Sequence, residues 1–101
     1  ILNFKDLKLQ DSGVIALCQA IDARPNVSEL HFDDQGLTSS GLAQVNLLLI
    51  STRNLERLNL WSNYFGDEGL RVLSQGLKSN KTLKSVDFGR NNLTKTGAEI
   101  L

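Results

Sequence analysis

The sequence predicts an α/β fold built from stacked copies of one strand–turn–helix unit. Two observations predict it: glycines recur every 28 residues, and apolar residues keep a fixed position relative to each glycine. The glycines are Gly13, Gly41, Gly69 and Gly97. Such a period is typical of a solenoid, in which each unit buries its apolar side chains against its neighbours.

Each unit is expected to begin with a short strand that has one buried face. Leu58 and Leu60 flank the polar Asn59, and an alternation of this kind is typical of a half-buried strand. The matching apolar positions in chain order are Leu2 and Phe4, then Val27, Leu30 and Phe32, then Leu55, Leu58 and Leu60, then Leu83, Val86 and Phe88.

A polar turn follows each strand. Asn63 and Asn91 each come three residues after the last apolar strand position. An asparagine side chain carries both a donor and an acceptor, so these residues are expected to turn inward and bond the backbone of neighbouring turns. Leu7 and Gln35 replace the asparagine in the first two units. The inward hydrogen bonds would form a ladder along the stacked turns, and the sequence does not decide whether this ladder continues in those two units.

A helix is expected to begin near each glycine. Its buried stripe is formed by residues four and eight positions later, such as Leu73 and Leu77 after Gly69. Thr38 and Thr94 are expected N-caps. Asp67 and Glu68 lie where the positive end of the helix dipole favours acids. The repeated glycines are expected to let the first turn approach the neighbouring backbone closely.

Two segments carry a family resemblance: LERLNLWSNYFGDEGLRVLSQGL at residues 55–77 and LKSVDFGRNNLTKTGAEIL at residues 83–101. They resemble leucine-rich repeats of the 28-residue, ribonuclease-inhibitor-like type. The resemblance implies an open right-handed solenoid, or horseshoe, with parallel strands on the concave face and helices on the convex face. It also implies a binding role, usually toward another protein and usually inside the cell.

The whole chain, residues 1–101, is expected to form one leucine-rich-repeat segment. Its repeats run approximately over residues 1–26 (partial), 27–54, 55–82 and 83–101 (partial). Neither end shows the polar cap that a free-standing solenoid requires, so the segment is expected to belong to a longer array.

Polar strand positions are expected to face the concave surface and to contact a partner. The predicted binding residues are Glu29, His31, Arg57, Asn59, Trp61, Asp87 and Arg90. Glu29 and Arg57 are expected to pair, because adjacent parallel strands lie ~4.8 Å apart. Trp61 has two interpretations: it projects into solvent as a binding hot spot, or it lies flat over Asn59 or Tyr64.

Several functional classes are disfavoured. Eleven basic and eleven acidic residues leave no net charge, which argues against nucleic-acid or membrane binding. His31 and Asp87 are expected to lie roughly 10 Å apart, two strands from each other, too far for a catalytic hydrogen bond. A single histidine with scattered acids is a poor metal site. We therefore expect no enzymatic activity, no cofactor and no small-molecule substrate.

Two short motifs are interpreted as structural. Asp87-Phe88-Gly89 spells the magnesium-binding triplet of protein kinases, but Phe88 keeps the register of an apolar strand position and the other kinase motifs are absent. Three glycosylation triplets, which begin at Asn26, Asn80 and Asn92, are attributed to chance in a turn-rich sequence.

The single cysteine, Cys18, excludes an internal disulfide. The absence of an internal disulfide favours a reducing compartment, and the expected location is the cytoplasm. Cys18 flanks the apolar stripe of its helix, so it is expected to be a semi-buried small residue and not a redox centre.

The predicted function is a non-catalytic protein–protein interaction module that uses the concave face. A second hypothesis is a spacer or docking segment of a large cytoskeletal, ciliary or scaffold assembly. Its contacts would lie on helix and loop surfaces, for example at Arg71, Lys78, Lys81 and Lys84. A third is the repeat region of a GTPase-activating or nucleotide-sensing protein whose catalytic parts lie elsewhere.

Overall fold

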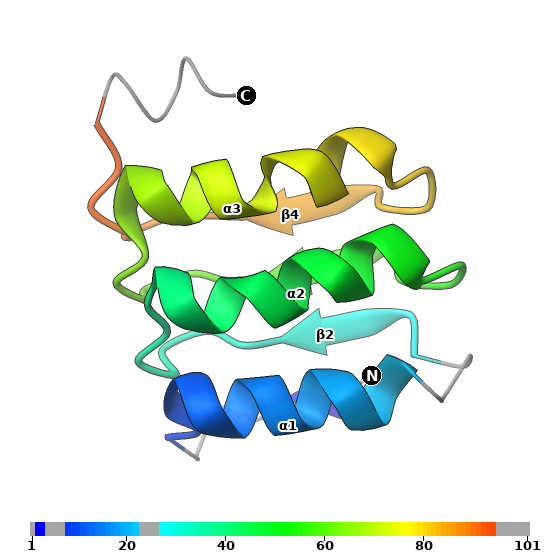
Figure 1. Ribbon diagram of the computed structural model, residues 1–101, viewed down its shortest axis with the longest axis horizontal. Helices are drawn as coiled ribbons and strands as arrows, with labels where there is room; N and C mark the ends of the chain where they lie inside the picture. Colours follow the sequence, from blue (N-terminus) through cyan, green and yellow to red (C-terminus); the bar gives the residue numbers. More distant parts are fainter. Residues whose placement is uncertain (1, 4–7, 23–26, 95–101) are drawn as a thin grey trace.

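A computed structural model of the protein describes residues 2–3, 8–22 and 27–94 (Figure 1). Predictions made for Phe4, Leu7, Asn26 and Gly97 lie outside these residues. The elements in chain order are β1 (Leu2–Asn3), α1 (Gln10–Asp22), β2 (Glu29–His31), α2 (Ser39–Ser51), β3 (Arg57–Asn59), α3 (Gly66–Ser79) and β4 (Ser85–Asp87).

The strands form one parallel sheet in the order β1-β2-β3-β4. Leu30 is opposite Leu58, and Leu58 is opposite Val86. Paired residues are thus 28 positions apart, which confirms the repeat length predicted from the glycines. Because every strand keeps this register, each outward position lies beside its equivalent in the next unit.

The helices form a second layer on one face of the sheet (Figure 1). Helix α2 lies between α1 and α3 and contacts both. This is the predicted two-layer α/β arrangement. In the part of the chain that the structure describes, no helix has the length and apolar character that crossing a membrane requires.

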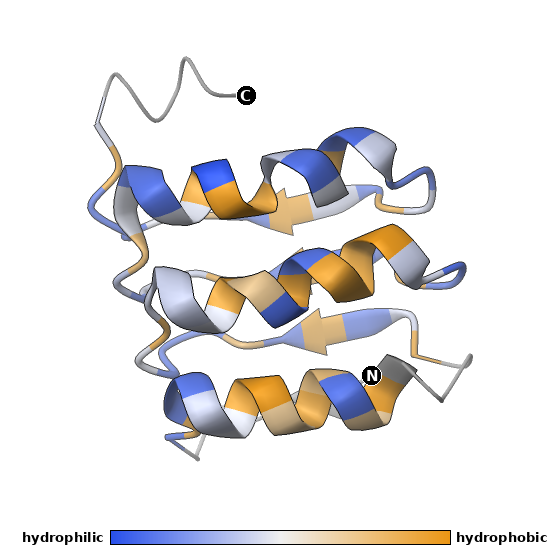
Figure 2. Ribbon diagram, in the orientation of Figure 1, coloured by the Kyte–Doolittle hydropathy of each residue, from blue (hydrophilic) through white to orange (hydrophobic). Residues whose placement is uncertain are grey.

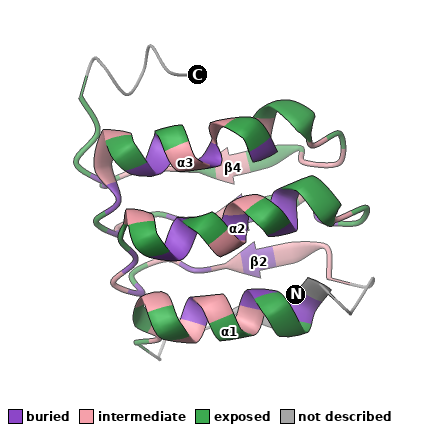
Figure 3. Ribbon diagram, viewed as in Figure 1, coloured by how far each residue is buried: buried purple, intermediate pink, exposed green. Residues whose placement is uncertain are grey.

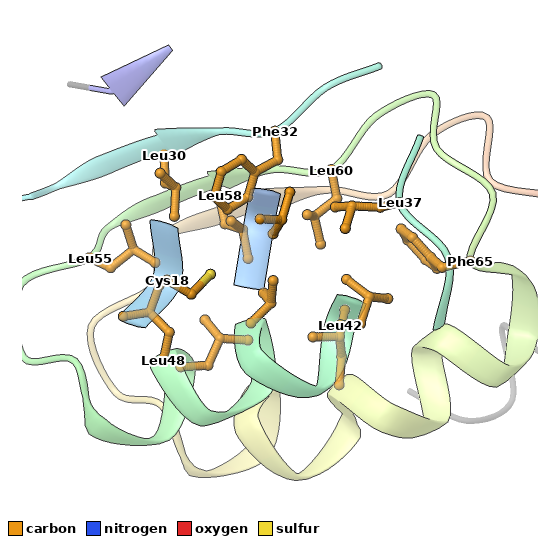
Figure 4. Close-up of a cluster of buried hydrophobic side chains, with 14 of the residues drawn as sticks. Cys18, Leu30, Phe32, Leu37, Leu42, Leu48, Leu55, Leu58, Leu60 and Phe65 are labelled. Atoms are coloured by element: carbon orange, nitrogen blue, oxygen red, sulfur yellow. The ribbon is translucent and has the colours of Figure 1, made fainter. Parts of the chain in front are cut away.

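The core lies between the two layers (Figure 4). Leu30, Leu58 and Leu60 point from the strands toward the helices, where they meet Leu42 and Leu48 of α2. Burial and hydropathy follow the same alternation along the elements (Figures 2 and 3). Each fully buried leucine contributes roughly 1.5–3 kcal/mol relative to an exposed one, so the repeated leucines hold the layers together.

The predicted asparagine ladder is present. The Asn63 Oδ1 accepts from the backbone N–H groups of Gln35 at 2.9 Å and Leu37 at 3.0 Å. Its Nδ2 donates to the carbonyls of Phe32 at 3.0 Å and Leu60 at 2.9 Å. Asn91 repeats the arrangement one unit later, where its Oδ1 accepts from the Asn63 N–H at 3.0 Å.

Gln35 continues this ladder where the sequence left it open. Its buried side chain accepts from the Leu9 N–H at 2.9 Å and donates to the Asp33 carbonyl at 3.1 Å. A glutamine has the same amide group as an asparagine on a side chain one methylene longer. The substitution therefore keeps the inward hydrogen bonds of the turn.

Helix α2 begins as predicted, with Thr38 as its N-cap accepting from the Ser40 N–H at 3.4 Å. An unpredicted contact holds this start: Asp11 in the first turn of α1 accepts from the Thr38 N–H at 2.8 Å. Asp67 accepts from the Thr94 N–H in the same way at 3.0 Å. An acid in the first turn of one helix thus binds the threonine that follows the strand and turn of the next unit.

The expected role of the repeated glycines was wrong in detail. A Cβ at Gly13 would lie 2.9 Å from the Leu9 Cβ, and one at Gly41 would lie 2.7 Å from the Leu37 Cδ2. These neighbours are side chains of the turn residue four positions earlier. At Gly41 the Cβ would come closer still to the Oδ1 of Asp11 in the preceding unit, which is also a side-chain atom and not backbone. The glycines therefore make room for the apolar turn residue that enters the core.

Candidate functional site

The sheet face turned away from the helices is formed by the outward positions of β2, β3 and β4, and we call it the open sheet face. Leu30 and Leu58 at the strand centres point into the core, so the residues on either side of them point outward. The face consists of two rows across the sheet, Glu29, Arg57 and Ser85, and then His31, Asn59 and Asp87.

This face contains a hollow of about 430 Å³. All six residues of the two rows line it, together with Leu58, Val86 and Phe88. Five of the seven residues predicted to bind a partner thus share one concavity: Glu29, His31, Arg57, Asn59 and Asp87. The strand register creates this grouping, because it brings positions 28 residues apart side by side.

The predicted pair of Glu29 and Arg57 was wrong. The two residues are opposite each other in the β2–β3 register, but the Glu29 Oε1 lies 3.4 Å from the His31 Nε2 on its own strand. Residues i and i+2 of a strand share a face, so His31 reaches Glu29 without crossing the sheet. Arg57 remains exposed at the centre of the hollow.

Asn59 and Asp87 have a structural role in addition to the one predicted. The Asn59 Oδ1 accepts from the Trp61 N–H at 2.9 Å, and the Asp87 Oδ1 accepts from the Gly89 N–H at 2.8 Å. Each bond closes a tight turn at the end of its own strand, and the two turns are of the same type. One oxygen of each side chain is therefore already engaged by the backbone.

Trp61 and Arg90 lie beyond the ends of β3 and β4, and neither lines the hollow. The Arg90 guanidinium carbon is 5.2 Å from the centroid of the Trp61 ring, a cation–π geometry. A Cβ at Gly89 would lie 2.5 Å from the Trp61 Cδ1. The indole packs against the next turn between Gly89 and Arg90, a place that neither sequence interpretation named, and its role as a binding hot spot stays a prediction. It is 38% exposed.

The face offers no recognisable catalytic or metal centre. Asn59 separates His31 from Asp87 in the strand register. Among the residues that the structure describes, no group of three or more His, Cys, Asp or Glu side chains is placed to hold a metal ion. Phe88 of the kinase-like triplet makes an edge-to-face contact with Phe65, with 6.4 Å between ring centroids, so its role is packing.

Cys18 is more buried than the semi-buried position predicted for it, with 2% of its surface exposed. Burial raises the pKa of its thiol to about 12. A thiol with such a pKa is protonated near neutral pH and is a poor nucleophile. The structure therefore gives Cys18 a packing role, as the sequence indicated.

The triplet at Asn80 serves the fold. The Asn80 Nδ2 donates to the Leu49 carbonyl at 2.8 Å, and its Oδ1 accepts from the N–H groups of Thr82 at 2.8 Å and Leu83 at 2.7 Å. The side-chain amide thus links the end of α2 to the loop before β4. The Thr82 hydroxyl also donates to the Leu55 carbonyl at 2.6 Å, so the fold explains both the asparagine and the threonine without glycosylation.

Sequence reasoning missed a close approach between α2 and α3. The Gly76 N–H donates to the Asn46 Oδ1 at 2.7 Å, and a Cβ at Gly76 would lie 2.9 Å from both the Asn46 carbonyl oxygen and the Leu49 Cβ. Gly76 falls outside the 28-residue glycine series, since Leu48 holds its position one unit earlier. The repeat pattern therefore gave no signal for it.

The alternative basic surface is partly paired. Arg71 lies 3.4 Å from Glu68 on α3, and Lys84 lies 2.9 Å from Glu56. Lys78 and Lys81 are exposed. Surface ion pairs of this kind contribute little to stability, and these residues form no enclosed site.

Known proteins resemble this chain in repeat sequence. A family model described as "Leucine Rich repeat" matches residues 52–74 and 79–101. The human NACHT, LRR and PYD domains-containing protein 14 is 34% identical over 102 residues, which is 99% of this chain and 9% of that protein. Protein NLRC5 of Ictalurus punctatus is 31% identical over 100 residues, which is 99% of this chain and 6% of that protein.

A solved structure resembles the fold. The structure titled "Leiomodin-1 Actin-Binding Site 2 (ABS2)" superimposes with a TM-score of 0.84 at 18% identity and covers 98% of this chain and 60% of its own. The two sequence relatives, the NACHT, LRR and PYD domains-containing protein 14 and NLRC5, are much longer, and the chain spans less than a tenth of the length of each. At this identity the likeness to leiomodin-1 shows the fold alone.

Proposed function

The chain is a leucine-rich-repeat protein, and from that premise we propose that it is a non-catalytic module that binds another protein through the open sheet face. The relatives and the repeat pattern support a protein-interaction role. The choice of face rests on the structure of this chain, since the resemblance to the family does not select residues.

The observation that carries this proposal is the hollow over β2, β3 and β4. Its rim consists of Glu29, Arg57 and Ser85 in one row and His31, Asn59 and Asp87 in the next. The repeat pattern fixes the leucines between them but not these positions, which differ from strand to strand. A concave surface lined by varied polar side chains suits recognition of another molecule.

A longer stack of such units would extend this surface. We propose the ribonuclease-inhibitor-like arrangement, in which strands line the inner face of a horseshoe and the open sheet face is its concave surface. Helices are wider than strands: helices pack 8–10 Å apart, whereas neighbouring strands are ~4.8 Å apart. Stacking the two layers in register therefore favours curvature toward the sheet.

We place the protein in the cytoplasm as part of the same proposal. The support is its single cysteine, which is buried and leaves no internal disulfide to form. This usage is typical of proteins in a reducing compartment.

Matched arginine substitutions on the two layers test the proposed face. Binders to the full chain would be selected from a displayed library of protein fragments, and their affinity measured for Ser85→Arg on β4 and Gln75→Arg on α3. Both positions are exposed, and each variant places the same arginine side chain and the same added charge on the surface. We expect Ser85→Arg to weaken binding by at least about tenfold and Gln75→Arg to leave it unchanged. The reverse pattern would refute the open sheet face.

A second candidate function is docking through the helix layer. The observation that favours it is the apolar outer face of α2, where Leu47 is 54% exposed and Ile50 is 44% exposed (Figure 2). The equivalent positions of α3 are the polar Gln75 and Lys78. Loss of binding in Gln75→Arg or Leu47→Ser, with Ser85→Arg unaffected, would support this candidate.

A further inference from the structure

We propose that the partner presents a single carboxylate to Arg57, at the centre of the hollow on the open sheet face. This inference rests on the proposed function, because it names the chemistry of the group that enters the hollow. It follows from three features of the face: the position of Arg57, the engagement of the neighbouring acceptors, and the acids on either side.

Arg57 is the first residue of β3, the middle of the three strands that form the open sheet face. In the strand register it lies between Glu29 on β2 and Ser85 on β4. Its side chain is exposed and lines the hollow. Within the described ranges its guanidinium has no ion pair or hydrogen bond, whereas Lys8, Arg71 and Lys84 each have an acidic partner. Its charge does act on the neighbouring Glu56, whose pKa is lowered first by Lys84 and to a smaller extent by Arg57. Arg57 is thus the arginine whose donors remain available where a ligand would sit.

The acceptors around Arg57 are partly engaged by the chain itself. Glu29 contacts His31, and one oxygen each of Asn59 and Asp87 accepts a backbone N–H. The donors that remain on this face are the Arg57 guanidinium, the Asn59 amide and the Ser85 hydroxyl, which line the same hollow. Beside the carboxylates of Glu29 and Asp87, these three donors can therefore meet an acceptor on the partner.

A carboxylate fits these donors better than a neutral carbonyl. The planar guanidinium fork forms two parallel hydrogen bonds with the two oxygens of a carboxylate, and such charge-assisted bonds are about twice as strong as neutral ones. Arg57 lies in a concavity, where water screens the pair less than on a flat surface. Exchange of arginine for lysine keeps the charge but removes the fork.

The neighbouring acids limit the charge that the partner can bring. Glu29 and Asp87 line the hollow on the strands either side of Arg57, so a second anionic group would meet like charges. An acidic run, a phosphate or a nucleic acid is disfavoured for this reason. The partner motif is therefore one Asp or Glu side chain, or a chain-terminal carboxylate, between neutral or basic residues.

A selection experiment tests the inference with the full chain. A displayed library of random peptides would be selected separately against the wild-type chain and Arg57→Glu, and the enriched peptides sequenced. The strongest binder would be resynthesised with its acid as Glu, Gln or Lys. Its affinity would be measured for the wild-type chain, Arg57→Lys, Arg57→Glu and the control Arg71→Glu on α3, which introduces the same charge outside the hollow.

We expect a single isolated acid in the peptides enriched by the wild-type chain, and its loss in those enriched by Arg57→Glu. Replacing the acid by Gln and Arg57 by Glu should each weaken binding at least about tenfold. Arg57→Lys should give an intermediate loss, and Arg71→Glu no change. Circular dichroism of each variant excludes unfolding as the cause.

Four results would overturn the inference. Peptides that lose affinity for Ser85→Arg but show no acid preference would refute the carboxylate and leave the proposed binding face intact. Peptides insensitive to Ser85→Arg and Arg57→Glu would refute both. Enrichment of peptides with several acids, or failure to enrich any peptide sensitive to Arg57→Glu, would also refute the single-carboxylate motif.

Discussion

The backbone N–H of Gln35 donates to the Asn63 Oδ1 over 2.9 Å, while the side chain of Gln35 accepts from the Leu9 N–H over 2.9 Å. Each turn thus satisfies the turn before it and is satisfied by the turn after it. Because these groups are buried, water cannot replace the bonds. The stacked turns form a polar spine beside the apolar core, and both the spine and the core stabilise the fold.

Asn63→Ala is expected to destabilise the chain by at least about 3 kcal/mol. The change removes the hydrogen bonds that join Asn63 to the N–H groups of Gln35 and Leu37 and to the carbonyls of Phe32 and Leu60. The Leu60 carbonyl keeps the bond from the Asn91 Nδ2. Each hydrogen bond lost contributes about 0.5–1.5 kcal/mol, and more where a buried group is left unsatisfied. Urea unfolding followed by circular dichroism measures the loss. Asn54→Ala, at an exposed position, is the control, and equal losses in the two variants would contradict the role of the spine.

Gly76→Ala is expected to destabilise the chain although alanine is the better helix former. Alanine gains up to about 1 kcal/mol in helix propensity. Its Cβ would lie 2.9 Å from the Asn46 carbonyl oxygen, and such overpacking costs about 1–3 kcal/mol. We expect a lower melting temperature for Gly76→Ala and a slightly higher or unchanged one for Gln75→Ala. A rise in both would show that α2 and α3 separate without cost.

Stability is expected to fall above pH 9 through Cys18. Burial raises the pKa of its thiol from 9.0 to about 12, so the folded chain keeps the proton that the unfolded chain loses. The free energy of unfolding is therefore unaffected by this group below pH 9 and decreases as the pH rises from 9 to 12. Urea titrations across this range should show a shallower decrease for Cys18→Ala. Identical slopes would contradict the assignment.

Gly89→Ala is expected to displace the indole of Trp61. The new Cβ would lie 2.5 Å from the Trp61 Cδ1, so the ring must leave its place between Gly89 and Arg90. Trp61 is the only tryptophan, and its fluorescence emission should shift to longer wavelength as the ring becomes more hydrated. Ser85→Ala on the same strand as Asp87 should leave the emission unchanged. An unshifted spectrum in Gly89→Ala would contradict the packing described.

The sequence predicted what the repeat itself determines. Leu58 and Asn63 recur at fixed spacing, and their burial and hydrogen bonds follow from stacking identical units. The outward rows followed from the same register, so five predicted residues meet in one hollow. The spacing of residues in the sequence does not determine which of several nearby groups a side chain contacts. Glu29 therefore meets His31 and not Arg57, and Trp61 meets Gly89 and Arg90.

Contacts that belong to one unit only were not predictable from the repeat. Gly76 breaks the glycine series, so its role appears only when α2 and α3 are placed together. The bond from the Thr38 N–H to Asp11 recurs between Thr94 and Asp67 but not in the unit between them, because the first turn of α2 has no acid. Such contacts distinguish one unit from the next, as do the polar residues of the open sheet face.

A chemical-shift footprint tests whether a protein partner binds the open sheet face. A binder selected against the full chain would be titrated into isotope-labelled protein, and backbone amide shifts followed residue by residue. We predict the largest changes at Arg57, Asn59 and Ser85, with α2 and α3 unaffected on their outer faces. Changes confined to Leu47, Ile50 and Lys78, with β2, β3 and β4 unperturbed, would contradict the account.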